Sequence, residues 1–354
     1  MRQSRLKVPA ERPVGFYHCI SRIIQRQFFF GDVERERFVA LLREYEAFCG
    51  VRVLTYCVLS NHFHVLVEVP KRPEVLPSAE ELLARLKKLS CHQDLGAFEQ
   101  RLALYRNPPT GSPEVGTPNA GPDAAGEQAF LESYFRRMWD VSWFLRLVKQ
   151  RFSTWYNQRN DRKGTLWEER FKSVLVDGAG EALVTMAAYI DLNPVRAGLA
   201  KDPKDYRWSG YAEAVAGSKR ARAGIQTIVT AMRRGKEEPA AKSLETYRMQ
   251  VFACGDEQRE NLTEDGRLQR GAIKRETVAE VLRRKGTLSL PEYLRCRVRY
   301  FCDGAIFGGK EFVEEMFGAH RGRFGPKRQS GARRMKGVDA DLFTVRDLQV
   351  GVFG

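Results

Sequence analysis

The segment from Leu54 to Pro70 constrains this chain more than any other. Val, Leu and Tyr residues flank a Ser60-Asn61 pair, and Pro70 closes the segment. That pattern is typical of two short strands joined by a tight turn. Side chains alternate between the two faces of a strand, so His62 and His64 point one way and Phe63 points the other. The sequence therefore predicts a strand pair that presents two imidazoles on one surface.

Two imidazoles on one strand face suit a divalent metal ion, because neutral imidazole is a common metal ligand. The chain has only five histidines, and two of them at this spacing favour a functional pair. The alternative is a pair of polar residues on a solvated strand face. The strand alone leaves both interpretations open.

Length and net charge limit the number of domains and the class of binding partner that we expect. A chain of 354 residues has room for two or three domains. Its formal net charge of +15 favours a polyanion, most often nucleic acid, over an acidic membrane surface. Solvated surface charge is the alternative. No apolar run of about 18 residues exists, so no membrane span is expected.

The cysteines and the N-terminus indicate a compartment. Seven cysteines form an odd set without CxxC spacing, which indicates free thiols in a reducing cytoplasm. The basic N-terminus has no apolar stretch after it, which argues against a signal peptide. We therefore expect a cytoplasmic protein with no membrane association.

The order of the expected elements indicates the fold class. Strands are predicted at 14–22, on both sides of Ser60-Asn61, and at 171–176. Helices are predicted at 32–49 with Asp32 as N-cap, at 78–95 with Ser78 as N-cap, at 139–159, and at 180–193, where Pro194 stops the helix. This order predicts an α+β fold in which a ferredoxin-like antiparallel sheet is backed by helices.

The chain divides into three parts by composition. We expect residues 1–215 to form one domain, interrupted by a flexible Pro/Gly-rich insertion at about 106–128. Residues 216–317 are expected to be a mainly helical accessory region. Its part from Leu288 to Phe317 is either a small packing domain or a helix-turn-helix-like pair around Gly304 that would bind a DNA duplex stem. Residues 318–354 are expected to be a flexible basic tail.

A second candidate group lies on the helix before Pro194. Tyr189 and Asn193 are four residues apart, so they lie on one helix face. A tyrosine and an amide one turn apart fit a nucleophile beside a metal ligand. The amide oxygen is a hard donor, which suits Mg²⁺ or Mn²⁺ better than zinc. The alternative is a core tyrosine followed by an ordinary helix-stop asparagine.

Four segments, taken together, match a known family in its order over roughly residues 10–215. The chain resembles the single-tyrosine (Y1) HUH transposases of the insertion-sequence-200 type, and most closely their relatives associated with repetitive extragenic palindromes (REP). One departure is Ile23-Ile24, where the family often has Gly-Asn, and it concerns the DNA contacts of the first loop. The matching segments are Tyr17 to Arg22, Val58 to Leu66, Gly164 to Ser173, and Tyr189 to Gly198.

The resemblance implies a site and an activity. It makes His62 and His64 a metal-binding pair, Asn193 the third, helix-borne ligand, and Tyr189 the nucleophile. The implied cofactor is Mg²⁺ or Mn²⁺. The implied activity is that of a transposase: a metal-dependent single-strand DNA endonuclease and strand transferase that works through a 5′-phosphotyrosine. The implied partner is single-stranded or hairpin DNA, bound by a monomer or homodimer in the nucleoid-associated cytoplasm.

Other interpretations remain at this stage. The chain is alternatively a sequence-specific DNA-binding protein whose catalytic site has lapsed, or a metal-dependent phosphoesterase in which Tyr189 is structural. His18 is expected to be a hydrogen-bonded structural histidine. Glu168 and Arg170 either orient ligands or phosphate, or form a buried salt bridge.

Overall fold

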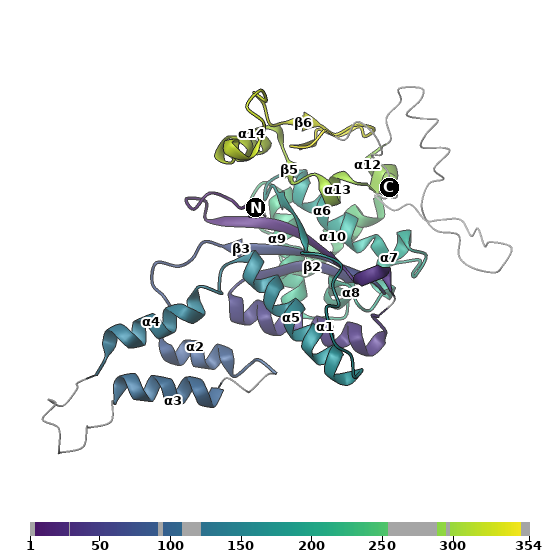
Figure 1. Ribbon diagram of the computed structural model, residues 1–354. Helices are drawn as coiled ribbons and strands as arrows, with labels where there is room; N and C mark the ends of the chain where they lie inside the picture. The colour runs from purple at the N-terminus through teal and green to yellow at the C-terminus, as the bar shows by residue number, and fades with distance from the viewer. Residues whose placement is uncertain are drawn as a thin grey trace, which may run out of the picture.

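The computed structural model describes residues 4–27, 29–90, 95–107, 122–253, 289–294 and 298–347. A seven-stranded sheet with the order β2-β3-β1-β4-β5-β7-β6 lies at its centre (Figure 1). The strands are β1 (Val14–Arg22), β2 (Arg52–Val58), β3 (His62–Pro70), β4 (Lys172–Val176), β5 (Ile306–Gly308), β6 (Arg333–Arg334) and β7 (Phe343–Thr344). The longer helices are α1 (Asp32–Cys49), α2 (Ala79–Leu86), α3 (Leu95–Arg106), α4 (Ala124–Phe135), α5 (Val141–Arg159), α6 (Glu181–Asp191), α9 (Lys219–Met232), α10 (Ala240–Ala253) and α14 (Lys310–Ala319).

The first four strands form the ferredoxin-like arrangement that the sequence predicts. In the order β2-β3-β1-β4, every neighbouring pair is antiparallel. The turn between β2 and β3 contains Ser60 and Asn61, and the Leu59 amide donates to the His62 carbonyl oxygen at 2.9 Å. The α+β, ferredoxin-like prediction is confirmed.

Each face of the sheet carries its own apolar core. On one face, α1 and α5 cover the sheet, and the fully buried Phe63 ring packs 4.6 Å from Phe38 and 5.7 Å from Trp167. On the other face, α6 and α9 cover β2, β3 and β4, and α10 packs on α9 (Figure 1). The alternation predicted for β3 is therefore observed: Phe63 serves the first core, and its histidine neighbours face the second.

The helices α2, α3 and α4 form a group that extends away from the sheet (Figure 1). Ser78 caps α2 in a capping box with Glu81, as its position predicts. The predicted helix over 78–95 is too long, because α2 ends at Leu86. Of the predicted insertion at about 106–128, residues 108–121 lie outside the described part, and α4 begins at Ala124.

Two helix ends differ from the sequence prediction. Gly31 is the N-cap of α1, and Asp32 is instead the first helical residue, where its carboxylate favours the positive end of the helix dipole. Helix α6 ends at Asp191, and the short helix α7 (Asn193–Arg196) follows with Pro194 in its first turn. Proline is tolerated there because that amide has no partner within the helix.

The chain after residue 215 contributes to both the sheet and the core. Helix α9 packs on β2, and β5 pairs with β4 in parallel. The short α12 (Leu290–Leu294) and α13 (Tyr300–Asp303) precede β5, and β5 separates α13 from α14. The predicted helix-turn-helix around Gly304 is therefore wrong, since a strand follows this glycine.

Residues 318–347 are not an extended tail. Strands β6 and β7 pair with each other, and β7 pairs with β5 at the end of the sheet. A division of the chain at residue 215 stays a prediction. Among the described residues, no helix is both long and apolar enough to span a bilayer.

Candidate functional site

His62 and His64 lie on the same face of β3, as the alternation predicts. Their ring centroids are 5.2 Å apart and their planes are inclined by 73°. His64 is 3% exposed, whereas His62 is partly exposed at the start of the strand. The Nδ1 atom of His62 lies 2.6 Å from Oδ1 of Asn61 in the preceding turn, so this contact orients the His62 ring.

His18 on the adjacent strand β1 joins this pair. Its ring stacks on His64 with a centroid separation of 5.1 Å and an interplanar angle of 16°. Its Nε2 lies 2.9 Å from Nδ1 of His64, and its Nδ1 lies 2.8 Å from the carbonyl oxygen of Phe301 on α13. His18 is thus a buried, hydrogen-bonded histidine, and it connects α13 to the histidine pair.

These contacts fix where the protons reside on the two rings. Burial lowers the pKa of His18 to about 4 and lowers the pKa of His64 well below its usual value, so both rings are neutral at pH 7. A carbonyl oxygen only accepts, so Nδ1 of His18 carries its proton, and Nε2 of His18 is an acceptor. Nδ1 of His64 therefore donates to His18, and Nε2 of His64 keeps its lone pair.

Tyr189 lies on α6 against the same histidines. Its ring centroid is 6.3 Å from that of His18 and 6.2 Å from that of His64, both at near-perpendicular angles. Phe301 covers it at a centroid distance of 4.6 Å, and its hydroxyl lies 3.7 Å from Sγ of Cys302. Tyr189 is therefore only 2% exposed, beneath α13.

Arg196 contacts Tyr189 in two ways. Its guanidinium lies 4.1 Å from the centre of the tyrosine ring, and its Nη2 donates to the Tyr189 carbonyl oxygen at 2.6 Å. Its Nη1 donates to the carbonyl oxygen of Leu294 on α12 at 2.8 Å. A positive charge against the ring face favours negative charge on the phenol oxygen.

Asn193 lies one helical turn after Tyr189 and is 8% exposed. Its Nδ2 donates to the carbonyl oxygens of Tyr189 and Ile190, at 3.2 and 3.1 Å. The amide oxygen, the atom that binds metals, is directed away from those two carbonyls by this arrangement. The structure thus places Tyr189 against His64, while the side-chain contacts described for Asn193 are with the end of α6.

Within the described ranges, no group of three His, Cys, Asp or Glu side chains is arranged to hold a metal ion. A metal site built on His62 and His64 therefore needs a third ligand of another type, and an amide oxygen is one such ligand. The assignment of His62, His64 and Asn193 as ligands and of Tyr189 as nucleophile stays a prediction.

Two parts of this site were not recognised from the sequence, namely the contact of His18 with the histidine pair and the cover of Tyr189 by Phe301 and Cys302. Strands β1 and β3 pair antiparallel, and in this register His18 lies on the same face of the sheet as His62 and His64. The alternation of side chains along the two expected strands was the signal that the sequence offered. Phe301 and Cys302 gave no signal, because they lie over a hundred residues from Tyr189 along the chain. Glu168 and Arg170 are both exposed, which excludes a buried salt bridge between them.

Comparison with known protein families shows a similarity over the first part of the chain. Residues 15–93, which include β1, α1, β2 and β3, match the family model described as "Transposase IS200 like". The resemblance to IS200-like transposases is confirmed. The match to the IS200-like model includes His18, His62 and His64 and ends before Tyr189 and Asn193.

A solved structure described as a REP-associated tyrosine transposase bound to a REP hairpin is also similar to this chain. The identity is 13% and the TM-score is 0.36, over 61% of this chain and 86% of the other. No curated protein sequence matches this chain. The IS200-like relationship therefore rests on the family model over residues 15–93.

Proposed function

We propose that this protein is a transposase: a divalent-metal-dependent, single-strand DNA endonuclease and strand transferase that uses Tyr189 as its nucleophile on hairpin-containing DNA. The observation that carries the proposal is the packing of Tyr189 on α6 against His18 and His64 on the sheet. The match of residues 15–93 to IS200-like transposases supports the same reaction class. The net charge of +15 supports a DNA partner.

The side chains offer the donor atoms that a divalent cation needs. His64 has Nε2 with its lone pair, His62 lies on the same strand face, and Asn193 on α7 would supply an amide oxygen. The hard amide oxygen favours Mn²⁺ or Mg²⁺, and the two imidazoles are ligands for divalent transition metals such as Mn²⁺. When bound, the cation would neutralise charge on the scissile phosphate and polarise phosphorus.

Tyr189 would perform the covalent step. Its phenol oxygen forms a bond to phosphorus as the bond between phosphorus and the 3′ oxygen breaks. The phenol proton is lost to solvent, and the departing 3′ oxygen gains one. The products are a 5′-phosphotyrosine and a free 3′-hydroxyl, so one phosphodiester has replaced another. A strand bearing a 3′-hydroxyl then reverses the step without ATP.

Two neighbours of Tyr189 shape this step. The Arg196 guanidinium at the ring face favours the negative charge that develops on the phenol oxygen during attack. Phe301 blocks access, since Tyr189 is 2% exposed beneath it. DNA therefore reaches Tyr189 only when α13 moves away from α6.

A nicking assay tests the proposal. The protein is incubated with single-stranded oligonucleotides that contain hairpins, with Mn²⁺ or Mg²⁺. Nicked DNA is expected with the unaltered protein and is expected to be lost in Tyr189→Phe and in excess chelator. Undiminished nicking by Tyr189→Phe would rule out this nucleophile, and nicking in chelator would rule out the metal.

The burial of Tyr189 favours one second candidate, a DNA-binding protein whose catalytic site has lapsed. In that protein Phe301 would cover Tyr189 permanently. It would bind hairpin DNA and leave it intact under every metal condition. Binding without nicking in the same assay would select this candidate.

A further inference from the structure

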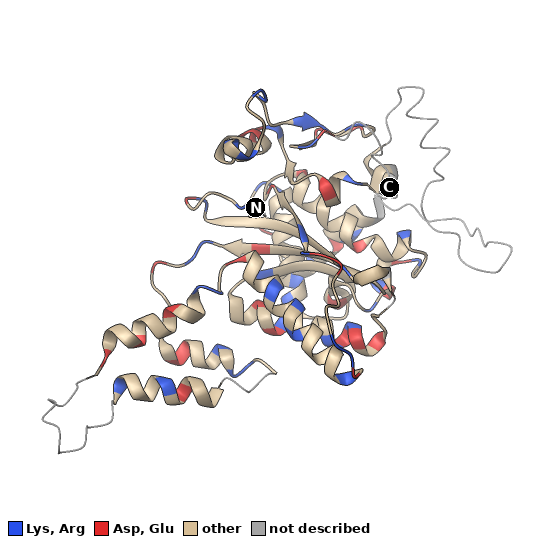
Figure 2. Ribbon diagram, in the orientation of Figure 1, with Lys and Arg blue, Asp and Glu red and all other residues tan. Residues whose placement is uncertain are grey.

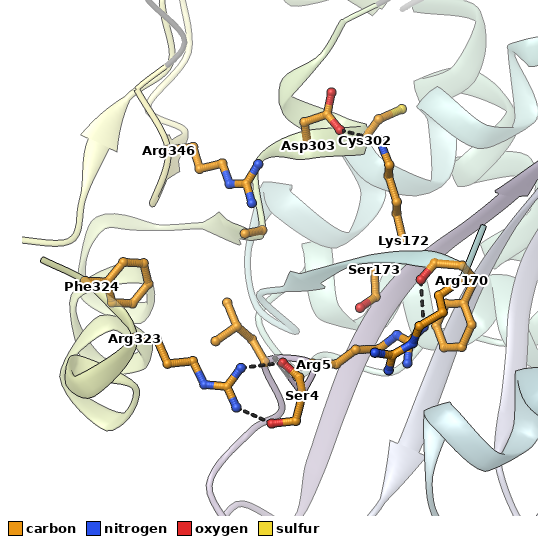
Figure 3. Close-up of a pocket in the computed structure, with 13 residues that line it drawn as sticks. Ser4, Arg5, Arg170, Lys172, Ser173, Cys302, Asp303, Arg323, Phe324 and Arg346 are labelled. Atoms are coloured by element: carbon orange, nitrogen blue, oxygen red, sulfur yellow. Dashed lines mark hydrogen bonds and ion pairs between the residues drawn. The ribbon is translucent and has the colours of Figure 1, made fainter. Parts of the chain in front are cut away.

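Three neighbouring cavities lie in the described part of the chain, and Tyr189 lines none of them. One of about 410 Å³ is open to solvent and is lined by the N-terminal segment, the start of β4, α13 and the chain around β7 (Figure 3). Five cationic side chains line it, against one carboxylate, that of Asp303. The cations are Arg5, Arg170, Lys172, Arg323 and Arg346.

The one carboxylate is already engaged. Asp303 lies 3.3 Å from Nζ of Lys172 and 3.5 Å from Nε of Arg299. Figure 3 shows Arg323 and Arg346 approaching the cavity from one side and Arg170 and Lys172 from the other. Along the helices drawn in Figure 2, by contrast, basic and acidic residues are interspersed. The cavity is therefore a local concentration of positive charge.

Like charges are crowded at one wall of the cavity. The Arg5 guanidinium lies 3.4 Å from the centre of the Phe171 ring and donates to the Phe171 carbonyl oxygen at 2.7 Å. Burial and the nearby Arg170 lower the pKa of Arg5. A bound anion would relieve this repulsion, since opposite charge stabilises the cationic forms.

Two further cavities share lining residues with the first. One of about 280 Å³ lies along β1 and α13 and includes Arg22 and Arg299, and one of about 610 Å³ lies along α5 and includes Lys7 and Arg146. Arg170 lines all three cavities. In each cavity basic side chains outnumber the acidic ones, which are Asp140, Glu169 and Asp303, and we call the three cavities together the Arg170 groove.

The Arg170 groove leads to the candidate site. Cys302 lines two of the cavities, and its Sγ is 3.7 Å from the Tyr189 hydroxyl. Arg22 lines the second cavity, and its partner across the β1–β3 ladder is His62. The groove therefore ends next to both the tyrosine and the histidine pair.

We propose that the Arg170 groove binds the phosphodiester backbone of single-stranded DNA and leads that strand to Tyr189. Guanidinium groups match phosphate oxygens in geometry and charge. Phe324 and Trp143 line the groove and offer aromatic faces for unpaired bases. This inference rests on the proposed function, because it assigns the path of the same substrate.

The test measures DNA affinity against salt concentration. A single-stranded oligonucleotide with a fluorescent label is titrated with full-length protein at several salt concentrations. Each phosphate contact contributes about 0.7 to the slope of log affinity against log salt. Arg170→Gln/Arg346→Gln is expected to reduce the slope by about 1.4 and to bind several-fold more weakly. A slope equal to that of the unaltered protein would overturn the proposal.

The control and a second measurement exclude unfolding as the cause. Arg136→Gln removes one positive charge from the exposed C-cap position of α4, outside the groove, and is expected to leave the slope unchanged. In the unaltered protein, phenylglyoxal should modify Arg170 and Arg346, and single-stranded DNA should protect both while Arg136 stays reactive. Equal reactivity of Arg170 and Arg346 with and without DNA would also overturn the proposal.

These measurements distinguish a failure of the groove proposal from a failure of the proposed DNA-cleavage reaction. A covalent DNA adduct in the unaltered protein, together with unchanged slopes and unprotected arginines, would remove the groove and leave the proposed function. Protected arginines and a reduced slope without any nicking would keep the groove as a DNA site and remove the proposed reaction.

Discussion

The Nε2 atom of His18 lies 2.9 Å from Nδ1 of His64 in the protein interior. The same His18 ring donates from Nδ1 to the carbonyl oxygen of Phe301, and the Phe301 ring covers Tyr189. A single hydrogen-bonded chain thus joins α13 to the histidine strand. His18 holds His64 in the tautomer whose Nε2 is free of its proton and able to bind a metal.

Replacement of His18 should weaken metal binding. His18→Leu leaves the Nδ1 proton of His64 without its acceptor, and the ring loses its fixed orientation. Loss of such a supporting contact typically reduces metal affinity by about 10–100-fold. Titration calorimetry with Mn²⁺ measures the change without reference to DNA cleavage.

The matched control for His18→Leu is His320→Leu. The His320 ring contacts the Lys7 carbonyl oxygen, away from β3, so its replacement should leave Mn²⁺ affinity unchanged. His18→Gln should recover part of the affinity, because a side-chain amide oxygen also accepts from His64. A folded His18→Leu protein with the affinity of the unaltered protein would contradict this role.

Phe301→Leu should make Tyr189 more accessible. The smaller side chain uncovers part of the tyrosine ring, while the Phe301 backbone carbonyl still accepts from His18. Nitration of Tyr189 by tetranitromethane, followed by peptide mass spectrometry, should be several-fold faster. The free energy of unfolding should fall by about 1 kcal/mol, as for a typical core substitution.

Phe317→Leu, on α14 and equally buried, is the control for general loosening. It should reduce stability by a comparable amount without faster nitration of Tyr189. Equal nitration rates in Phe301→Leu and the unaltered protein would show that Phe301 does not limit access.

Lys149 should make stability depend on pH above neutrality. Its Nζ donates to Oγ of Ser21 at 2.7 Å, and burial lowers its pKa to about 7. In the unfolded chain lysine keeps its proton up to about pH 10. Between these values the unfolded state binds more protons, so the Lys149 contribution to stability rises as pH increases from about 7 toward 10 and stays at its lowest value below pH 7, where both states hold the proton.

Lys149→Met should remove that contribution. Urea unfolding at pH 7, 8 and 9 is expected to show the unaltered protein gaining stability relative to the variant with each step, by at most about 1.4 kcal/mol per pH unit. Lys236→Met, at an exposed position, should follow the unaltered protein. A parallel pH dependence for Lys149→Met and the unaltered protein would contradict the assignment.

Gly224 should tolerate no side chain. Helix α9 approaches β2 so closely here that a Cβ atom on Gly224 would lie 2.5 Å from the Leu54 carbonyl oxygen. Gly224→Ala should therefore destabilise the protein by about 1–3 kcal/mol through overpacking. Gly318→Ala on α14, where a Cβ meets nothing within 4 Å, should instead stabilise the helix by up to about 1 kcal/mol. Thermal unfolding of both variants checks this contrast.

Most of the fold could be predicted from local patterns in the sequence. Alternation placed Phe63 in one core and His64 on the other face, and the spacing of Ser78 and Glu81 predicted a helix start. These features depend on neighbours along the chain, which a sequence displays directly. The order of elements was then enough to predict the ferredoxin-like sheet.

Contacts between residues far apart along the chain could not be predicted from such local patterns. The parallel pairing of β5 with β4 and the cover of Phe301 over Tyr189 join residues more than a hundred positions apart. The predicted helix-turn-helix failed for this reason, because Ile306 to Gly308 are strand residues through their pairing with β4 on one side and β7 on the other. For the site, the sequence predicted that His62 and His64 lie on one strand face. It did not predict that His64 is linked to α13 by hydrogen bonds through His18.

The most direct test of the account is the identity of the covalent adduct. The protein is incubated with hairpin-containing single-stranded DNA and Mn²⁺, then digested with trypsin and nuclease. Cleavage after Lys172 and Arg196 releases a peptide in which Tyr189 is the only tyrosine. The account predicts a phosphonucleotide on Tyr189 in this peptide and none in Tyr189→Phe. Nicked DNA with an unmodified peptide, or an adduct on another residue, would contradict it.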